Sequence, residues 1–105
     1  MKTFLWRISS KKLSKTNLSL YSRFIKKNYK FNSYSKYDKI WKWSVSNPSI
    51  FWKSIWDFTK VKGTKGNILL KRSNIFFKNK FFPYAKLNYT KNLLKKNSTD
   101  PAIIF

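Results

Sequence analysis

Residues 41–58, WKWSVSNPSIFWKSIWDF, hold four of the five tryptophans of this chain, and the fold depends on what these rings pack against. Asn47-Pro48 predicts a helix start within this stretch, because asparagine can cap a free backbone N–H and proline suits the first helical position. Apolar residues then recur at helical spacing with polar residues opposite, so we expect a helix whose rings form the core of a small domain. The apolar positions are Phe51, Trp52, Ile55, Trp56 and Phe58 or Thr59, and the polar positions are Lys53, Ser54 and Asp57.

The charge of the chain is extreme for its size. Its 105 residues allow one domain with a modest core. Against 24 Lys and Arg stand three Asp and no Glu, which gives a net charge of +21. Repulsion at this density disfavours a compact state unless an anionic ligand or a protein surface neutralises it.

Two interpretations of this charge stay open. Cations together with aromatic residues are typical of nucleic-acid-binding proteins, in which the cations contact phosphates and the rings stack on bases. The abundance of Lys, Asn, Ile, Phe and Tyr is also typical of AT-rich coding sequence, and only Arg7, Arg23 and Arg72 could make bidentate contacts. Composition alone does not decide between the two, and we expect no specific nucleic-acid partner.

Several classes of chemistry are excluded by residue type. The chain has no Cys and no His, so it can form no disulfide, no thiolate or imidazole metal site and no histidine base. Asp38, Asp57 and Asp100 are far apart in sequence, and each is expected to be a surface residue or a helix cap. We therefore predict no catalytic, cofactor-binding or metal-binding residue in this chain.

The sequence contains no segment of membrane-spanning type. The apolar patch at Phe4-Leu5-Trp6 is too short for the core of a signal peptide, and no window approaches the roughly 20 apolar residues that cross a bilayer. We expect a soluble, cytoplasmic protein.

Two further helices are predicted before Pro48. Asn17 is a plausible cap for a helix to about Asn28, and its face is expected to dock on a core rather than lie on a membrane. Ser35 followed by Asp38 resembles a capping box that opens a helix ending before Pro48. The apolar face of the first of these helices comprises Leu18, Tyr21 and Ile25, with Leu20 and Phe24 beside it.

The second half of the chain predicts turns and short extended segments. Gly63 and Gly66 bracket a turn, although this Gly-x-x-Gly lacks the further glycines and the Lys-Ser/Thr of a phosphate loop. Residues 68–70 and 81–83 are expected to be extended, and residues 73–80 remain ambiguous. Asn88 is expected to cap a short helix over residues 89–95.

The last four residues, Ala102-Ile103-Ile104-Phe105, have the character of a buried strand. Such a strand usually lies inside a sheet that is covered on both faces, and a parallel sheet needs partner strands joined by crossovers. No other segment supplies these partners. We therefore expect the chain to be mostly α with short extended segments and incomplete as a fold.

Many short segments of the chain resemble the N-terminal region of acetoacetyl-CoA synthetases, which are relatives of acetyl-CoA synthetase in the adenylate-forming acyl-CoA ligase superfamily. Each segment is weak alone, but the series follows the order and spacing of the family along nearly the whole chain. The matching residues are Trp6 with Ser9, Asn17-Leu18, Phe24, Tyr37, Trp43-Ser44-Val45, Phe51-Trp52, Trp56-Asp57-Phe58, Phe82-Pro83, Ala85, Leu87-Asn88-Tyr89, Asn92-Leu93-Leu94 and Pro101-Ala102-Ile103.

The chain also departs from the family pattern in an informative way. The changes at Thr90-Lys91, together with the absence of any Glu, indicate a drifted or very AT-rich copy. A Glu-to-Lys change in a short helix costs only about 0.5 kcal/mol per lost pair, but many such changes accumulate. The departures are Ile8 for Pro, Phe81 for Trp, Tyr84 for a small or acidic residue, Lys86 for Arg and Thr90-Lys91 for Ala-Glu.

The resemblance implies a reaction for the complete enzyme, in which ATP and acetoacetate form an acyl-adenylate and coenzyme A then displaces AMP. ATP, magnesium and coenzyme A are thus implied for the family enzyme, whose phosphate loop, Thr-Glu motif and lid lysine have no counterpart here. Residues 1–105 would be an inactive N-terminal domain that caps the α/β enzyme, with residues 102–105 as the first strand of the nucleotide-binding domain. Its partner would be the remainder of the ligase. The alternative is a small basic nucleic-acid-binding or ribosome-associated protein.

Overall fold

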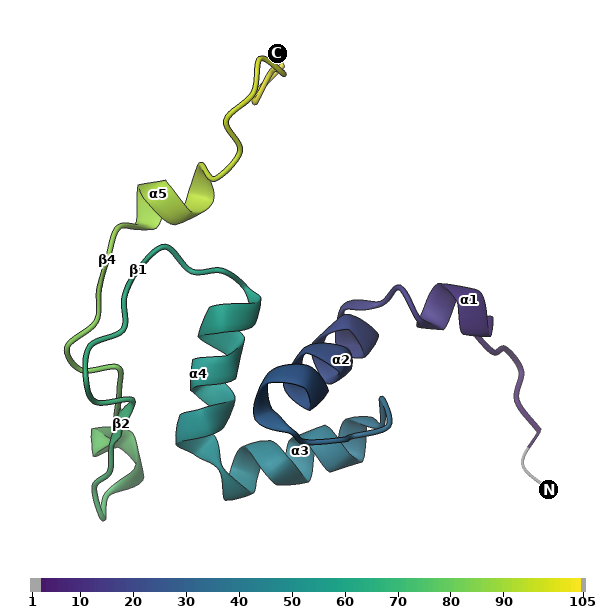
Figure 1. Ribbon diagram of the computed structural model, residues 1–105, viewed down its shortest axis with the longest axis horizontal. Coiled ribbons are helices and arrows are strands. Elements are labelled where there is room, and N and C mark those ends of the chain that lie inside the picture. Colours follow the sequence, from purple (N-terminus) through teal and green to yellow (C-terminus); the bar gives the residue numbers. More distant parts are fainter. Residues whose placement is uncertain (1–2, 105) are drawn as a thin grey trace. The chain divides into compact units, whose positions relative to one another are not determined.

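The computed structural model describes residues 3–104, which are mostly helical with a few short strands, as predicted (Figure 1). The chain divides into two compact units, an N-terminal unit that ends at Phe58 and a C-terminal unit that begins at Thr59. The N-terminal unit contains α1 (Ser10–Leu13), α2 (Asn17–Tyr29), α3 (Tyr37–Ser46) and α4 (Pro48–Phe58). The C-terminal unit contains β1 (Gly63–Thr64), β2 (Leu70–Lys71), the 3₁₀ helix η1 (Phe76–Lys78), β3 (Lys80–Phe81), β4 (Lys86–Leu87) and α5 (Tyr89–Leu93).

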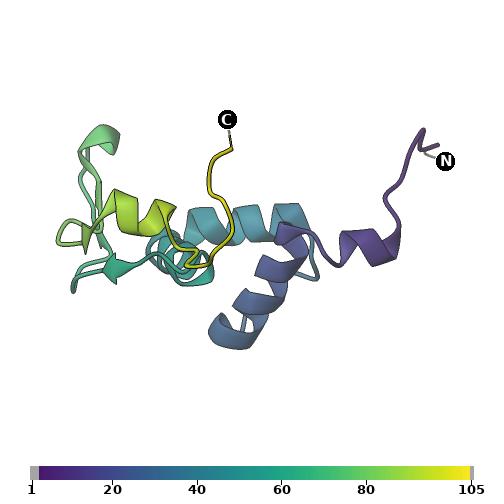
Figure 2. The same ribbon diagram turned by 90° about the horizontal axis from the view of Figure 1, so that it is seen from above.

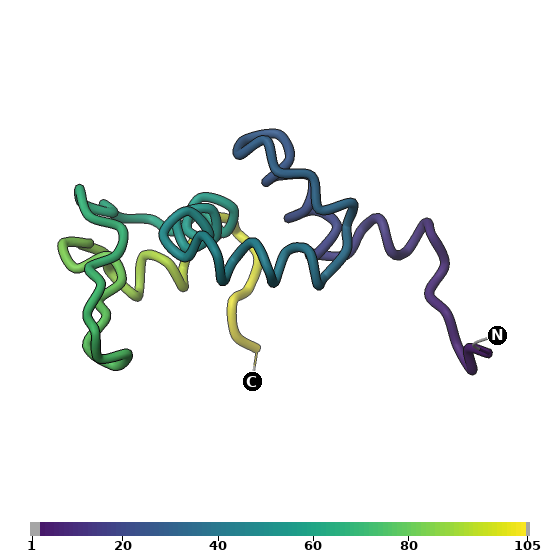
Figure 3. Tube along the Cα trace, turned by 90° about the horizontal axis from the view of Figure 1, so that it is seen from below, coloured from purple at the N-terminus to yellow at the C-terminus, as the bar shows by residue number. Residues whose placement is uncertain are grey.

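The core of the N-terminal unit lies where α2, α3 and α4 meet. Figure 2 and Figure 3 show α2 running across α3 rather than along it. Ile25 is completely buried between these helices, and Tyr21 and Ile40 are each 5% exposed. Around them pack the rings and aliphatic side chains of Phe24, Tyr29, Phe31, Trp43, Phe51, Ile55 and Phe58.

The rings of this core contact one another in the geometries that aromatic pairs prefer. Trp43 stacks on Phe31 with ring centroids 5.0 Å apart and planes 9° from parallel. Tyr21 meets Phe58 edge-on at 5.2 Å. The prediction that the helix from Pro48 packs its rings into a core is therefore confirmed for Phe51 and Phe58.

Two details of that prediction were wrong. Ser54, expected on the polar side of α4, is completely buried, because its hydroxyl pairs with Tyr21 of α2. Trp52, expected in the core, is 42% exposed. Asn47 lies directly before Pro48, where α4 begins as predicted, and its backbone carbonyl accepts from the Phe51 N–H at 2.9 Å. Asn47 also ends α3, because its backbone N–H and its Nδ2 both donate to the carbonyl of Trp43.

The predicted starts of the two preceding helices also shift. The cap of α2 is Thr16 rather than Asn17, since the Thr16 side chain accepts a hydrogen bond from the Ser19 N–H at 3.3 Å. The cap of α3 is Lys36, which makes no side-chain capping bond. Ser35 instead has a φ of 56°, and its N–H donates to the Ser22 hydroxyl, so it opens no capping box.

The buried apolar face of α2 contains fewer residues than the sequence pattern predicts. Tyr21 and Ile25 are buried and Phe24 packs against them, but Leu18 and Leu20 are 37% and 41% exposed. Serine residues are buried in this unit where leucines are not. Ser22 and Ser33 are buried and hydrogen-bonded to each other, which satisfies two polar groups inside the unit.

The C-terminal unit is built on two nested antiparallel ladders. β1 pairs with β4 through Gly63↔Leu87, and β2 pairs with β3 through Leu70↔Phe81. A Cβ at Gly63 would lie 2.6 Å from the Lys86 carbonyl oxygen, so only glycine lets the outer ladder close this tightly.

The extended segments were predicted only in part. Of the segment expected to be extended over residues 68–70, only Leu70 lies in a strand, β2. The segment over 81–83 bends at Phe82, which has a φ of 45°. Asn88 caps α5 as predicted by accepting from the Lys91 N–H at 3.1 Å, although α5 ends at Leu93. Residues 102–104 form no strand here, and Phe105 lies outside the described residues.

Across residues 3–104, no helix is both long enough and apolar enough to cross a bilayer.

Candidate functional site

Helix α3 has apolar side chains on two sides. Its inner side carries Ile40, which is buried, and Trp43, which packs against the core. A second set of apolar residues recurs at every fourth position and lies in solvent. Tyr37 is 67% exposed, Trp41 53% and Val45 64%. We call these three residues the α3 stripe.

The spacing of the stripe places its side chains together. Residues four apart on a helix are neighbours on its surface, so Tyr37, Trp41 and Val45 form one continuous apolar ridge. Contiguous apolar patches on a protein surface often mark sites that contact another protein body. The stripe is therefore a candidate docking surface.

The sequence pattern could have revealed the stripe, although it was not predicted. Two apolar sets overlap in residues 37–45, and only one of them can face the core of the unit. The helix itself is positioned by Asp38 in its first turn, where a carboxylate favours the helix dipole, and by Pro48 just beyond its end. The outer set faces solvent because Ile40 and Trp43 turn the other side of α3 toward the core.

Hydroxyl groups inside the N-terminal unit are structural rather than reactive. Ser54 donates to the Phe51 carbonyl at 2.6 Å, so the Tyr21 hydroxyl must be the donor in the 2.5 Å contact between Tyr21 and Ser54. Burial raises the pKa of Tyr21, and the hydrogen bond with Ser54 only partly offsets this. A nucleophilic serine needs an adjacent base, and the proton of Ser54 is already committed to a carbonyl.

The three carboxylates have separate local roles. Asp57 accepts from the Tyr29 hydroxyl at 3.1 Å and lies 3.6 Å from the Lys53 ammonium. Asp100 accepts from Lys96 at 2.7 Å, and hydrogen bonds from Lys96 and Ser98 lower its pKa. Within residues 3–104, no three metal-ligating side chains come together. These donors therefore do not fit a magnesium site.

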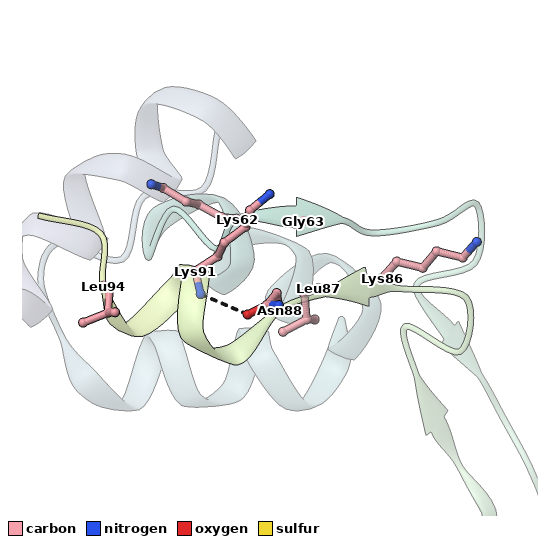
Figure 4. A pocket seen from close by; sticks show the side chains of 7 residues that line it. All are labelled: Lys62, Gly63, Lys86, Leu87, Asn88, Lys91 and Leu94. Atoms are coloured by element: carbon pink, nitrogen blue, oxygen red, sulfur yellow. Dashed lines mark hydrogen bonds between the residues drawn. The ribbon is translucent and has the colours of Figure 1, made fainter. Parts of the chain in front are cut away.

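One open hollow of the C-terminal unit lies between β1, β4 and α5 (Figure 4). Asn92 fixes one side of it by accepting from the Lys62 N–H at 2.7 Å and donating to the Lys62 carbonyl at 2.9 Å. Lysines line the hollow, but Figure 4 shows Lys86 extending away from Lys62 and Lys91. The three ammonium groups do not converge on one point, so the hollow does not form a phosphate-binding cradle.

The rings expected to make contacts in the second half are mostly exposed. Phe81 is 46% exposed, Tyr84 62% and Tyr89 75%. Leu93 and Leu94 are each 65% exposed. As on α3, the apolar side chains of the family-like segments here are left uncovered within the unit.

Comparisons with known proteins agree with the resemblance found in the sequence. The chain is 38% identical over 73 residues to the acetoacetyl-coenzyme A synthetase of Rhizobium meliloti (strain 1021), a match that covers 70% of this chain and 11% of that protein. It is 25% identical over 103 residues to the acetoacetyl-CoA synthetase of Xenopus tropicalis, covering 96% of this chain and 15% of that protein. No protein-family model matches the chain, and no solved structure matches it significantly.

The chain thus spans less than a sixth of the length of the curated relatives that it matches. It is similar to acetoacetyl-CoA synthetases along most of its own length, which confirms the resemblance predicted from its sequence.

Proposed function

We propose that this chain is the N-terminal packing segment of an acetoacetate–CoA ligase and is inactive alone. In this proposal, residues 1–105 form a helical cap of an α/β adenylate-forming enzyme in the cytoplasm. Residues 102–105 become the first strand of the nucleotide-binding domain once partner strands are present. The similarity to two acetoacetyl-CoA synthetases supports the assignment.

The α3 stripe is the observation that carries the proposal. Trp41 at 53% exposure and Val45 at 64% lie on a helix whose other side is already packed. Burying an exposed apolar side chain contributes about 1.5–3 kcal/mol, so a covering body would gain substantially from this ridge. A packing role explains why a helix in a small unit has two apolar sides.

The chemistry would belong to the complete enzyme. When bound, ATP, magnesium and coenzyme A would supply adenylation and thioester formation, and no residue of this chain is assigned to them. What this chain contributes is the ordered N-terminal unit, held by the Tyr21–Ser54 and Tyr29–Asp57 hydrogen bonds between α2 and α4.

A chimera tests the proposal. The 73 matched residues of the Rhizobium meliloti synthetase would be replaced by the corresponding residues of this chain, and CoA thioester formation from acetoacetate and ATP would be measured. We expect the chimera to be active and the isolated chain to be inactive. Turnover by the isolated chain, or a chimera that cannot fold, would contradict the proposal.

The stripe itself is tested inside the chimera. We expect Trp41→Ser with Val45→Ser to lower its unfolding temperature by several degrees, because a covered apolar contact is lost. Lys39→Ser with Lys42→Ser changes two neighbouring surface positions of α3 and should leave that temperature nearly unchanged. Equal stability of the two double variants would remove the packing role from the stripe.

A further inference from the structure

We propose that a second open hollow, at the end of the β2–β3 hairpin, binds single-stranded nucleic acid. The inference does not depend on the ligase assignment, because it is argued from a hollow of the C-terminal unit and not from the α3 stripe or from the similarity to synthetases. Its volume is about 590 Å³, within the ~300–1,000 Å³ typical of ligand pockets. The hollow is lined by Lys71, Arg72, Ser73, Phe77, Lys78 and Lys80.

Backbone pairing and two short polar side chains build this hollow. The ladder places Lys71 opposite Lys80, so two cations stand at the base of the hairpin loop. Across the loop, Asn79 accepts from the Ser73 N–H at 2.7 Å, and the Ser73 hydroxyl accepts from the Ile75 N–H at 3.2 Å. The loop between the strands is therefore held in shape by its own hydrogen bonds.

The rings of the loop are presented to solvent. Phe76 is 89% exposed and Phe77 is 81% exposed, and both lie in η1. Phe77 shares the hollow with four cationic side chains. An exposed ring beside several cations matches a ligand that has both flat bases and phosphates, since bases stack on aromatic rings while cations replace the counterions of the phosphates.

No carboxylate competes with such a ligand near the hairpin. Residues 59–99 contain eleven Lys and Arg and no acidic residue. Asp100 follows them, and it is hydrogen-bonded to Lys96 and Ser98. The hairpin thus has uncompensated positive charge that a polyanion would neutralise.

The concave placement of the cations favours nucleic acid over a lipid surface. A membrane-inserting loop needs only an apolar tip with cations around it, whereas here Lys71, Arg72 and Lys78 line a hollow together with one ring. A strand of nucleic acid can place a base on Phe77 and its phosphates on the surrounding cations at the same time. Single strands fit this arrangement because their bases are free to stack.

The proposal is tested by binding of the complete chain to a labelled 12-nucleotide oligo-dU. Fluorescence anisotropy measures the affinity. Replacement of both rings (Phe76→Leu with Phe77→Leu) keeps the tip apolar but removes the stacking surface, so affinity should fall about tenfold or more. Phe4→Leu alters an exposed ring of the N-terminal unit and should leave the affinity unchanged. Circular dichroism would confirm that each variant keeps its helical content.

The salt dependence isolates the contribution of the cations. Lys78→Gln with Lys80→Gln should reduce the slope of log affinity against log salt by about 1.4, because each phosphate contact on a single strand contributes about 0.7. Lys11→Gln with Lys12→Gln removes the same charge from exposed positions of α1 and should change the slope less.

Two results would overturn the proposal. If an abasic strand of the same length binds as tightly as oligo-dU, the chain attracts phosphates by charge alone. The second result is that the Phe76→Leu/Phe77→Leu variant binds oligo-dU as tightly as the native chain, and that both proteins bind vesicles of phosphatidylcholine with 30% phosphatidylserine. The hairpin would then bind a lipid surface instead of nucleic acid.

Discussion

At the scale of single residues, the N-terminal unit depends on a few polar groups buried among rings. The sequence predicted Tyr21 and Ile25 on one face of a helix, since the spacing of apolar residues is a local signal. It did not predict that Ser54 is completely buried, because the donor that satisfies its hydroxyl comes from Tyr21, 33 residues earlier. Ser54 is therefore a small polar residue in the core, although the spacing of apolar residues in α4 predicts a solvent-exposed position for it.

Tyr21→Phe should lower the free energy of unfolding by about 0.5–1.5 kcal/mol, since it removes one buried hydrogen bond while Ser54 keeps its bond to Phe51. Urea unfolding followed by circular dichroism would measure the change. Tyr84→Phe is the matched control, because Tyr84 is 62% exposed, and it should have almost no effect. An equal loss in the two variants would show that the Tyr21–Ser54 bond does not stabilise the unit.

The same residue gives a pH dependence whose direction follows from its burial. Burial raises the pKa of Tyr21 above the value of about 10 that tyrosine has in the unfolded chain. The stabilisation is complete below pH ~10 and is lost as the pH rises through the folded-state pKa, because the unfolded state releases the proton first. The stability difference between the native chain and Tyr21→Phe should therefore shrink above pH ~10, and a difference that grows there would contradict this assignment.

At the scale of elements, helix interiors were predictable, whereas the caps of α2 and α3 were not. The helices over 17–29, 37–46 and 48–58 follow from apolar spacing and from the position of Pro48. Thr16 was missed as a cap because Asn17, directly beside it, is an equally good capping type. The ladders of the C-terminal unit join residues up to 24 positions apart, Gly63 with Leu87, so no local pattern could reveal their register.

Thr16→Ala should destabilise the N-terminal unit by about 0.5–2 kcal/mol, the usual cost of losing a capping side chain. The Thr16 hydroxyl accepts from the Ser19 N–H and donates to the Leu13 carbonyl, so its loss leaves both groups without this partner. Asn17→Ala should change the stability by less than about 0.5 kcal/mol. Thermal unfolding of the two variants compares the two positions directly. A larger loss of stability for Asn17→Ala than for Thr16→Ala would show that Asn17 is the cap, as the sequence predicted.

At the scale of the whole molecule, the sequence gives the number of charged and apolar residues. It does not give the places on the surface where the fold exposes them. The sequence indicated a large net charge, many aromatic residues and an incomplete fold, and it resembled one ligase family. It could not show which of the two overlapping apolar sets of α3 is left uncovered, because that depends on which side of α3 packs against Ile25 and Phe51. Similarity to acetoacetyl-CoA synthetases can be recognised in the sequence, whereas a docking surface depends on which side chains the fold leaves exposed.

The net charge of +21 predicts a strong dependence of stability on ionic strength. Repulsion among exposed cations weakens when the Debye length shortens from about 30 Å at 0.01 M salt to about 10 Å at 0.1 M. The unfolding temperature of the isolated chain should therefore rise as sodium chloride is increased over this range. Differential scanning calorimetry would measure it, and a temperature that stays constant or falls would mean that repulsion does not limit the folded state.

Whether the α3 stripe is covered in a complete ligase can be measured by the reactivity of a cysteine placed on it. The chain has no cysteine, so Val45→Cys introduces a single reactive position on the stripe and Lys42→Cys provides a matched exposed control. Alkylation rates at each position would be measured by peptide mass spectrometry in the isolated chain and in the Rhizobium meliloti chimera. We predict that position 45 reacts at least tenfold more slowly in the chimera while position 42 is unchanged. Equal alkylation rates at position 45 in the two proteins would show that the ligase does not cover the α3 stripe.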